Sequence, residues 1–363
     1  MRLKSRLFTT GMLSIALLAA ACGGASEGPV KPGGDANPSG LTIQGAGATF
    51  PYPLYSKWIS EYNKKNPSLK IDYQSIGSGG GIKQITERTV DFGASDAPMN
   101  DEQLKAAPKE ILHIPTVLGA VVVTYNLPEV TAPLQLEGPT VAAIFMGQIK
   151  KWNDPKIAAS NEGVALPDKD IAVVHRSDGS GTTAIFVDYM AKVSTEWKDK
   201  VGVGTSVNWP TGIGGKGNEG VSGSVKQTPG SIGYVELIYA KQNSLAVASI
   251  KNSAGKFVVP SLESVTAAAA GVAARIPDDL RVSVTNADGD ASYPISGFTY
   301  LLVYKDQDDA VKAKALVEFI WWALSEGEKM ASDLGYSALP AEVLTKAQAK
   351  VRLINVGGKT FVP

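Results

Sequence analysis

Three loops rich in Gly, Ser and Thr constrain the fold of this chain more than any other feature of its sequence. They lie at residues 45–50, 77–81 and 176–182, and each follows a short β-rich run and precedes a helical pattern. Alternating strands and helices are typical of α/β proteins. The sequence therefore predicts an α/β architecture in which these loops end strands and begin helices.

The elements beside the loops follow from apolar periodicity and from the positions of proline. Pro51 and Pro53 suit the first turn of a helix, and Asn66-Pro67 ends it. The apolar stripe of this helix is expected in the core; it consists of Leu54, Trp58, Ile59 and Tyr62. The other expected elements are strands at 41–43, 70–75 and 171–174, a helix at 82–88, and a helix from 182 to about Trp197.

Two lobes are expected, because 363 residues exceed the usual size of one compact domain. A β-branched run at 121–125 is interpreted as a strand that leaves the first lobe. A second extended run at 298–304 would return the chain to it, followed by a helix from about 308 to 325. Two crossing strands form a hinge that can close around a ligand. The buried side of the last helix is expected to carry Val311, Ala315, Leu316, Phe319 and Ile320, and the predicted lobes are residues 41–126 with 292–363, and 127–291.

The N-terminus has the parts of an export signal. Basic residues within positions 2–6 precede an apolar run at 12–18 that is too short to span a bilayer, and small residues follow at 19–21. Cys22, the only cysteine, comes next. This arrangement resembles the bacterial lipoprotein signal, in which the cysteine is lipidated, although Ala19 stands where that pattern prefers Leu. The alternative is ordinary cleavage that leaves a free thiol.

Residues 23–40 are rich in Gly and Pro and almost without apolar side chains, which predicts a flexible tether. Joined to a lipidated Cys22, this tether would keep the folded part in the periplasm or at the outer face of the cell membrane. The 35 acidic residues balance the 35 basic ones. A nucleic-acid partner is therefore not expected, since no excess of positive charge is available to bind its backbone.

The three loops together have the composition of an oxyanion site. A helix N-terminus leaves backbone N–H groups unpaired and carries partial positive charge, and glycine lets a ligand approach the backbone. Arg176 adds a guanidinium fork, which Asp178 can orient. Ser or Thr beside Gly in any single loop is more often a helix cap, so the prediction depends on all three. The candidate hydroxyl donors are Thr49, Ser78, Ser180 and Thr182.

Asp96 is the candidate determinant of specificity. A carboxylate beside a bound anion is favourable only where the anion carries a proton that the carboxylate can accept. Phosphate keeps a proton at neutral pH and sulfate does not, so Asp96 would reject sulfate. The alternative is that Asp96 caps a turn before Pro98.

From Leu41 to the C-terminus the chain resembles the periplasmic phosphate-binding proteins of bacterial ABC-type phosphate uptake systems. The motifs that carry the resemblance are GAGATFPYP at 45–53, IGSGGG at 76–81, VDFGASDAP at 90–98, RSDGSGT at 176–182 and GGKGNEG at 214–220. The resemblance implies a periplasmic-binding-protein (Venus-flytrap) fold of two α/β lobes. It also implies delivery of inorganic phosphate to a membrane permease with its ATPase subunits, with no cofactor and no metal. The implied phosphate-binding residues are Thr49, Phe50, Ser78, Asp96, Arg176, Ser180, Gly181 and Thr182, with Asp178 as the partner of Arg176.

The sequence gives weaker support to other functions. A phosphatase lacks a candidate base, since the chain has only His113 and His175 and no cluster with metal-ligand spacing. A dinucleotide-binding enzyme lacks the third glycine of its fingerprint, which Phe50 replaces, and a P-loop fails because Gly217 follows Lys216. The run at 214–220 is interpreted instead as a flexible loop. A binding protein for sulfate or molybdate stays open, and Asp96 discriminates against it.

Overall fold

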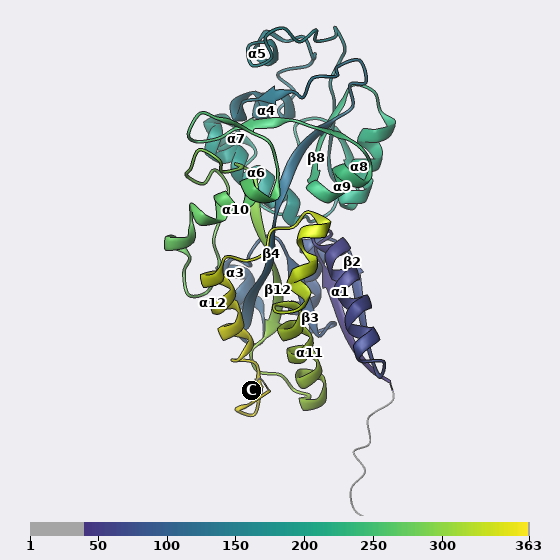
Figure 1. Cartoon of the computed structure of the whole chain (residues 1–363), viewed down its shortest axis with the longest axis vertical. Coiled ribbons are helices and arrows are strands. Elements are labelled where there is room, and N and C mark those ends of the chain that lie inside the picture. Colours follow the sequence, from purple (N-terminus) through teal and green to yellow (C-terminus); the bar gives the residue numbers. More distant parts are fainter. Residues whose placement is uncertain (1–39, 362–363) are drawn as a thin grey trace, which may run out of the picture. The chain divides into compact units, whose positions relative to one another are not determined.

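The computed structural model describes residues 40–361 (Figure 1). The predicted signal segment, Cys22 and the tether up to residue 39 lie outside the described residues. A nine-stranded sheet runs through the described part, in the order β2-β1-β3-β12-β4-β8-β6-β7, with β9 also paired to β4. Helices pack against this sheet along its length, so the predicted α/β architecture is confirmed.

The first half of the sheet has a parallel core. β1 (Leu41–Gly47) pairs in parallel with β2 (Leu69–Ser75) and β3 (Phe92–Ser95). α1 (Tyr52–Lys65) has prolines at its start, buries Leu54, Tyr55, Trp58 and Tyr62, and ends at Asn66, close to its predicted limits. α2 (Ser78–Thr86) follows β2.

Strand β4 (Ile111–Tyr125) connects the two halves of the sheet. All of its residues are buried. Residues 111–120 pair antiparallel with β12 (Ser296–Tyr304), which also pairs with β3, whereas residues 121–125 pair with β8 (Ser231–Glu236). β4 and β12 therefore lie where the predicted crossing strands were placed, and Figure 1 shows both in the middle of the molecule's described part.

The second half repeats the strand–helix alternation. β6 (Ala172–Arg176) pairs in parallel with β8 and with β7 (Ile213–Gly215). The helices that begin or lie near the site in this half are α6 (Gly181–Val193), α8 (Gly217–Gln227) and α9 (Leu237–Gln242), and α7 (Thr195–Lys200) follows α6.

The remaining elements complete the two halves. The helices are α3 (Asp101–Ala106), α4 (Gly138–Phe145), α5 (Pro155–Ala158), α10 (Leu262–Ala270), α11 (Ala310–Ala323) and α12 (Ala341–Val351). Short 3-10 segments occupy Ala273–Arg275, Gly327–Met330 and Ser332–Leu334. The strands are β5 (Gln135–Leu136), β9 (Ala246–Val247), β10 (Ser249–Lys251), β11 (Phe257–Val258), β13 (Asn355–Val356) and β14 (Lys359–Thr360). Among residues 40–361, none of the helices combines the length and the apolar character that a membrane span needs.

Four local predictions are wrong. The helix expected to reach Trp197 stops at Val193, because Ser194 is extended and its side chain accepts a hydrogen bond from the backbone of Trp197, which starts α7. The helix expected from residue 82 begins at Ser78. Val311 is 53% exposed instead of buried. The run at 214–220, expected to be a flexible loop, forms the end of β7 and the start of α8.

Candidate oxyanion site

The starts of three helices meet between the two halves of the sheet. The loops before α1, α2 and α6 place Phe50, Ser78, Gly181 and Thr182 in the interior, as predicted. Within residues 40–361, the backbone N–H groups of these four residues donate to no other group of the chain. These donors are therefore available to an anion, which their partial positive charge would attract.

Close approach of the first and second halves depends on glycine. A Cβ atom on Gly181 would lie 2.4 Å from Oγ of Ser78 and 2.5 Å from Oδ2 of Asp96, closer than atoms can pack. The backbone N–H of Gly79 also donates to the carbonyl of Gly179 at 2.9 Å. The second and third loops are thus in direct contact.

Asp96 lies at the end of β3 and is 4% exposed. Its Oδ1 accepts a hydrogen bond from Oγ1 of Thr299 at 2.8 Å, and its Oδ2 lies 3.4 Å from Oγ of Ser78. Burial raises the pKa of Asp96 to about 7, against smaller opposing contributions from Thr299, Arg176 and Ser78. The carboxyl faces the other loops and not the turn before Pro98, where Oγ of Ser95 bonds to the backbone of residue 97 instead.

Arg176, which is buried, and Asp178, which is partly buried, form an ion pair, the arrangement that the sequence predicted. Nε of Arg176 donates to Oδ1 of Asp178 at 2.8 Å and Nη2 donates to Oδ2 at 2.5 Å. The guanidinium side chain is 1% exposed. Burial favours a raised pKa for Asp178, but the hydrogen bonds and charge of Arg176 outweigh it and lower that pKa. The remaining guanidinium nitrogen, Nη1, points to Oγ1 of Thr182 at 3.4 Å.

The family follows from comparison with known proteins. The model of the PBP superfamily domain matches residues 33–326. A phosphate-binding protein PstS of Pasteurella multocida is 52% identical over 323 residues, covering 88% of this chain and 93% of the relative. One of Haemophilus influenzae is 49% identical over 315 residues, covering 86% of this chain and 93% of the relative. The chain belongs to the PstS family.

Solved structures agree on the fold. A high affinity periplasmic phosphate-binding protein (PfluDING), solved with phosphate bound at pH 8.5, aligns with a TM-score of 0.68 at 22% identity, covering 85% of this chain and 93% of that chain. The PstS chain described here therefore has the fold of periplasmic binding proteins, with two α/β lobes joined through the central strands.

Two residues that contact the candidate site residues were not among the sequence candidates. Asn218, at the start of α8, contacts Thr49 and Thr182. Thr299, on β12, contacts Asp96. The available signal for Asn218 was the Gly-rich run after a strand, which resembles the other three loops; no local pattern marked Thr299. Ser180, a predicted site residue, also caps α6, because its Oγ accepts a hydrogen bond from the backbone N–H of Thr183 at 3.0 Å.

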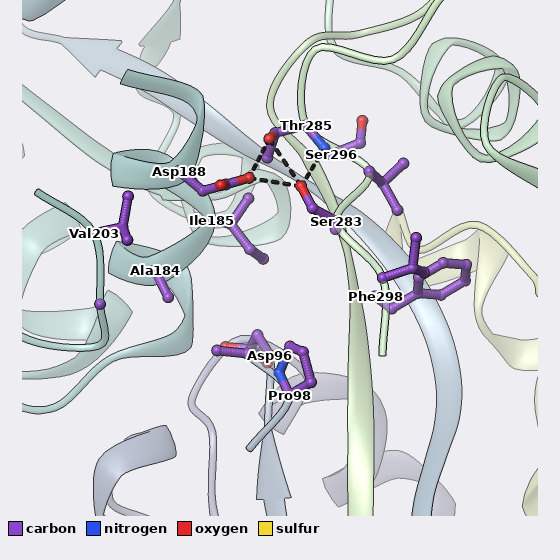
Figure 2. A pocket seen from close by; sticks show the side chains of 15 residues that line it. Asp96, Pro98, Ala184, Ile185, Asp188, Val203, Ser283, Thr285, Ser296 and Phe298 are labelled. Carbon is purple, nitrogen blue, oxygen red and sulfur yellow. Dashed lines mark hydrogen bonds between the residues drawn. The ribbon is translucent and has the colours of Figure 1, made fainter. Parts of the chain in front are cut away.

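A pocket of about 250 Å³ has Asp96 among its lining residues (Figure 2). Its walls are mostly apolar and come from α6 and from the segments around residues 282–285 and 296–298. Thr49, Ser78, Arg176 and Thr182 do not line it. The hydroxyls of Ser283 and Thr285 both bond to Asp188, so these polar groups satisfy one another. The pocket is therefore distinct from the cluster of anion donors.

Metal chemistry receives no support from the side-chain clusters. Among residues 40–361, no group of three or more His, Cys, Asp or Glu side chains could hold a metal ion. His175 stacks on Trp209 with a centroid distance of 4.8 Å, which accounts for its position beside Arg176 by packing.

Proposed function

We propose that this chain binds inorganic phosphate between its two lobes and delivers it to an ABC-type phosphate transporter, consisting of membrane permease and ATPase subunits. The names of its relatives and the phosphate bound in its structural neighbours support this function. The chain would act as a binding protein and not as an enzyme.

One observation carries the choice of phosphate: a buried carboxyl group, Asp96, stands among the anion donors. Its raised pKa means that a proton is readily shared between Asp96 and an anion at neutral pH. Phosphate can supply or receive that proton, whereas sulfate carries none and needs the protonated form of Asp96, which becomes scarce as the pH rises above about 7. The proposed ligand groups are the backbone N–H groups of Thr49, Phe50, Gly181 and Thr182, the hydroxyls of Thr49, Ser78, Ser180 and Thr182, the guanidinium of Arg176, and the carboxyl of Asp96.

Export and anchoring belong to the same proposal. The signal pattern in residues 1–22 and the tether in 23–40 support lipidation of Cys22 and attachment to the membrane, with the lobes on its outer side. The proposed lobe boundaries near residues 126 and 292 fall close to the end of β4 at Tyr125 and the start of β12 at Ser296.

Isothermal titration of phosphate-free protein with phosphate and with sulfate tests the proposal. At pH 8 or above, where Asp96 is mostly ionised, we expect tight binding of phosphate and at least about 100-fold weaker binding of sulfate, because an ionised buried acceptor facing an unprotonated anion costs several kcal/mol. Asp96→Asn should reduce this ratio by at least tenfold. Glu328→Gln is the control, since burial raises the pKa of Glu328 to about 7 as well but Glu328 bonds to Leu339. Sulfate binding as tight as phosphate binding in the wild type would refute the assignment.

A further inference from the structure

Asn218 is held in a single orientation. It is fully buried at the start of α8, and its Oδ1 accepts a hydrogen bond from the backbone N–H of Glu236 at 2.9 Å. If the amide were flipped, its NH2 group would face that N–H and both would be donors. The Nδ2 group of Asn218 therefore points away from β8 and toward the predicted site.

Asn218 occupies both acceptor positions of the Thr49 hydroxyl. Its backbone N–H lies 3.2 Å from Oγ1 of Thr49 and its Nδ2 lies 2.7 Å from the same atom. A hydroxyl group has two acceptor lone pairs and one proton. With both lone pairs engaged, the proton of Thr49 must point in the remaining direction and act as a donor.

The Thr182 hydroxyl is held in the same way. Its Oγ1 accepts from Nδ2 of Asn218 at 3.1 Å and from Nη1 of Arg176 at 3.4 Å. Nδ2 carries two protons, one for each threonine. One amide group thus sets the direction of two hydroxyl protons, one from each lobe.

We propose that Asn218 is a positioning residue that fixes the hydroxyls of Thr49 and Thr182 as donors to the bound anion. The inference rests on the proposed function, because the anion is the acceptor that these protons would meet. A free hydroxyl can rotate and accept a proton from a ligand, which would let the site tolerate different protonation patterns. Locking both hydroxyls as donors leaves Asp96 to accept the ligand's proton, so Asn218 contributes to specificity as well as to affinity.

A purely structural role is the alternative to exclude. Asn218 also connects α8 to the loop before α1 and to the start of α6, so its loss could weaken binding by loosening the contact between the lobes. The two roles differ in one respect. Positioning requires the hydroxyls of the two threonines, whereas a structural contact between the lobes does not.

The test is a thermodynamic cycle measured by titration with inorganic phosphate. We expect Asn218→Leu to lower phosphate affinity by about 10- to 100-fold, the usual value of a hydrogen bond to a charged group. In a Thr49→Val, Thr182→Val background the same substitution should cost less than about threefold, because no hydroxyl remains to be positioned. An equal loss in both backgrounds would overturn the positioning role.

Further variants separate the remaining outcomes. Asn161→Leu is the matched control, since Asn161 is a buried asparagine that makes hydrogen bonds at both ends to the backbone of Gln135 and should lower stability without changing phosphate affinity. If Asn218→Leu does not fold, Asn218→Ser, which suits a helix start but is too short to reach both hydroxyls, takes its place in the cycle. Wild-type protein that binds no phosphate would refute the proposed function and this inference with it. If the wild type binds phosphate and the Asn218 variants bind it with the same affinity, this inference alone is refuted.

Discussion

Asp96, which is buried, and Asp178, which is partly buried, have opposite electrostatic properties. Asp96, in the first lobe, accepts hydrogen bonds from the hydroxyls of Thr299 and Ser78, and burial raises its pKa to about 7. Asp178, in the second lobe, is partly removed from water, yet its two hydrogen bonds with Arg176 keep its pKa below the usual range. Burial acts on both carboxyl groups, and the presence of a cationic partner decides the result.

The difference assigns the two carboxyl groups different tasks. The negative charge of Asp178 neutralises the positive charge of Arg176. The pair therefore adds little net charge to the site, while Asp178 holds the guanidinium in place. Asp96 has no such partner and can exchange a proton near neutral pH. A bound anion would then be held mainly by backbone and hydroxyl dipoles and be recognised through its proton.

The largest effect should come from the cation itself. Arg176→Lys keeps the charge but cannot bond to both oxygens of Asp178 and reach Thr182 as well. We expect phosphate affinity to fall by about 1,000-fold or more, since several charge-assisted hydrogen bonds are lost together. Isothermal titration measures this loss. Arg281→Lys, which alters an arginine paired with Asp279 and Asp101 outside the site, should leave affinity unchanged.

The sequence could predict Asp178 because its partner is two residues away. The three strand–loop–helix units could also be predicted from the sequence, since each is defined by neighbouring residues. The roles of Asn218 and Thr299 could not be predicted in this way. Asn218 contacts Thr49 at a sequence separation of 169 residues, and Thr299 contacts Asp96 at a separation of 203. Such contacts depend on how the two lobes are connected, which no local pattern describes.

The start of α2 shows a second limit of sequence reasoning. Gly is unfavourable inside helices, so the run at 79–81 predicted a loop. In the structure these glycines form the first turn, because a Cβ atom at Gly81 would lie 2.5 Å from the carbonyl oxygen of Ala94. Close packing of α2 on β3 outweighs helix propensity here.

The second prediction concerns the pH dependence of stability that Asp96 causes. Its pKa is higher in the folded protein than in the unfolded chain, so ionisation opposes folding. Without phosphate, wild-type stability should fall as the pH rises from about 4 to 7, with a contribution from Asp96 on the order of 4 kcal/mol. Asp96→Asn should match the wild type near pH 4 and exceed it at pH 8.

Urea unfolding at several pH values measures this slope. Some decline should persist in Asp96→Asn, because burial also raises the pKa values of Glu236 and Glu328. A variant whose slope equals that of the wild type would mean that Asp96 is ionised throughout, and the contrast with Asp178 would disappear.

The third prediction concerns Asp178, whose effect on the pH dependence of stability is opposite to that of Asp96. The lowered pKa of Asp178 means that its ionised form stabilises the folded state at neutral pH, and this contribution is lost as the pH falls below about 4. Asp178→Asn leaves Arg176 buried without a charged partner and should cost about 3 kcal/mol at pH 7. The difference from the wild type should shrink near pH 3.

Denaturant unfolding at both pH values tests the third prediction. Asp279→Asn is its control, because the Asp279 side chain is 49% exposed beside Arg281 and such pairs contribute less than about 1 kcal/mol. A cost for Asp178→Asn that is equally small would show that the buried pair contributes no more than a surface one.

The smallest effect should come from Thr299, which links Asp96 to the central strand β12. Its hydroxyl favours the ionised form of Asp96 by donating to Oδ1, against the larger effect of burial. Thr299→Val removes this donor with little change in shape, so stability at pH 8 should fall by about 1 kcal/mol and the pKa of Asp96 should rise further above 7. NMR titration of the labelled carboxyl group follows that pKa directly. If it falls instead, the hydroxyl was accepting a proton from Asp96 rather than donating to it, and the carboxyl group is neutral even before an anion arrives.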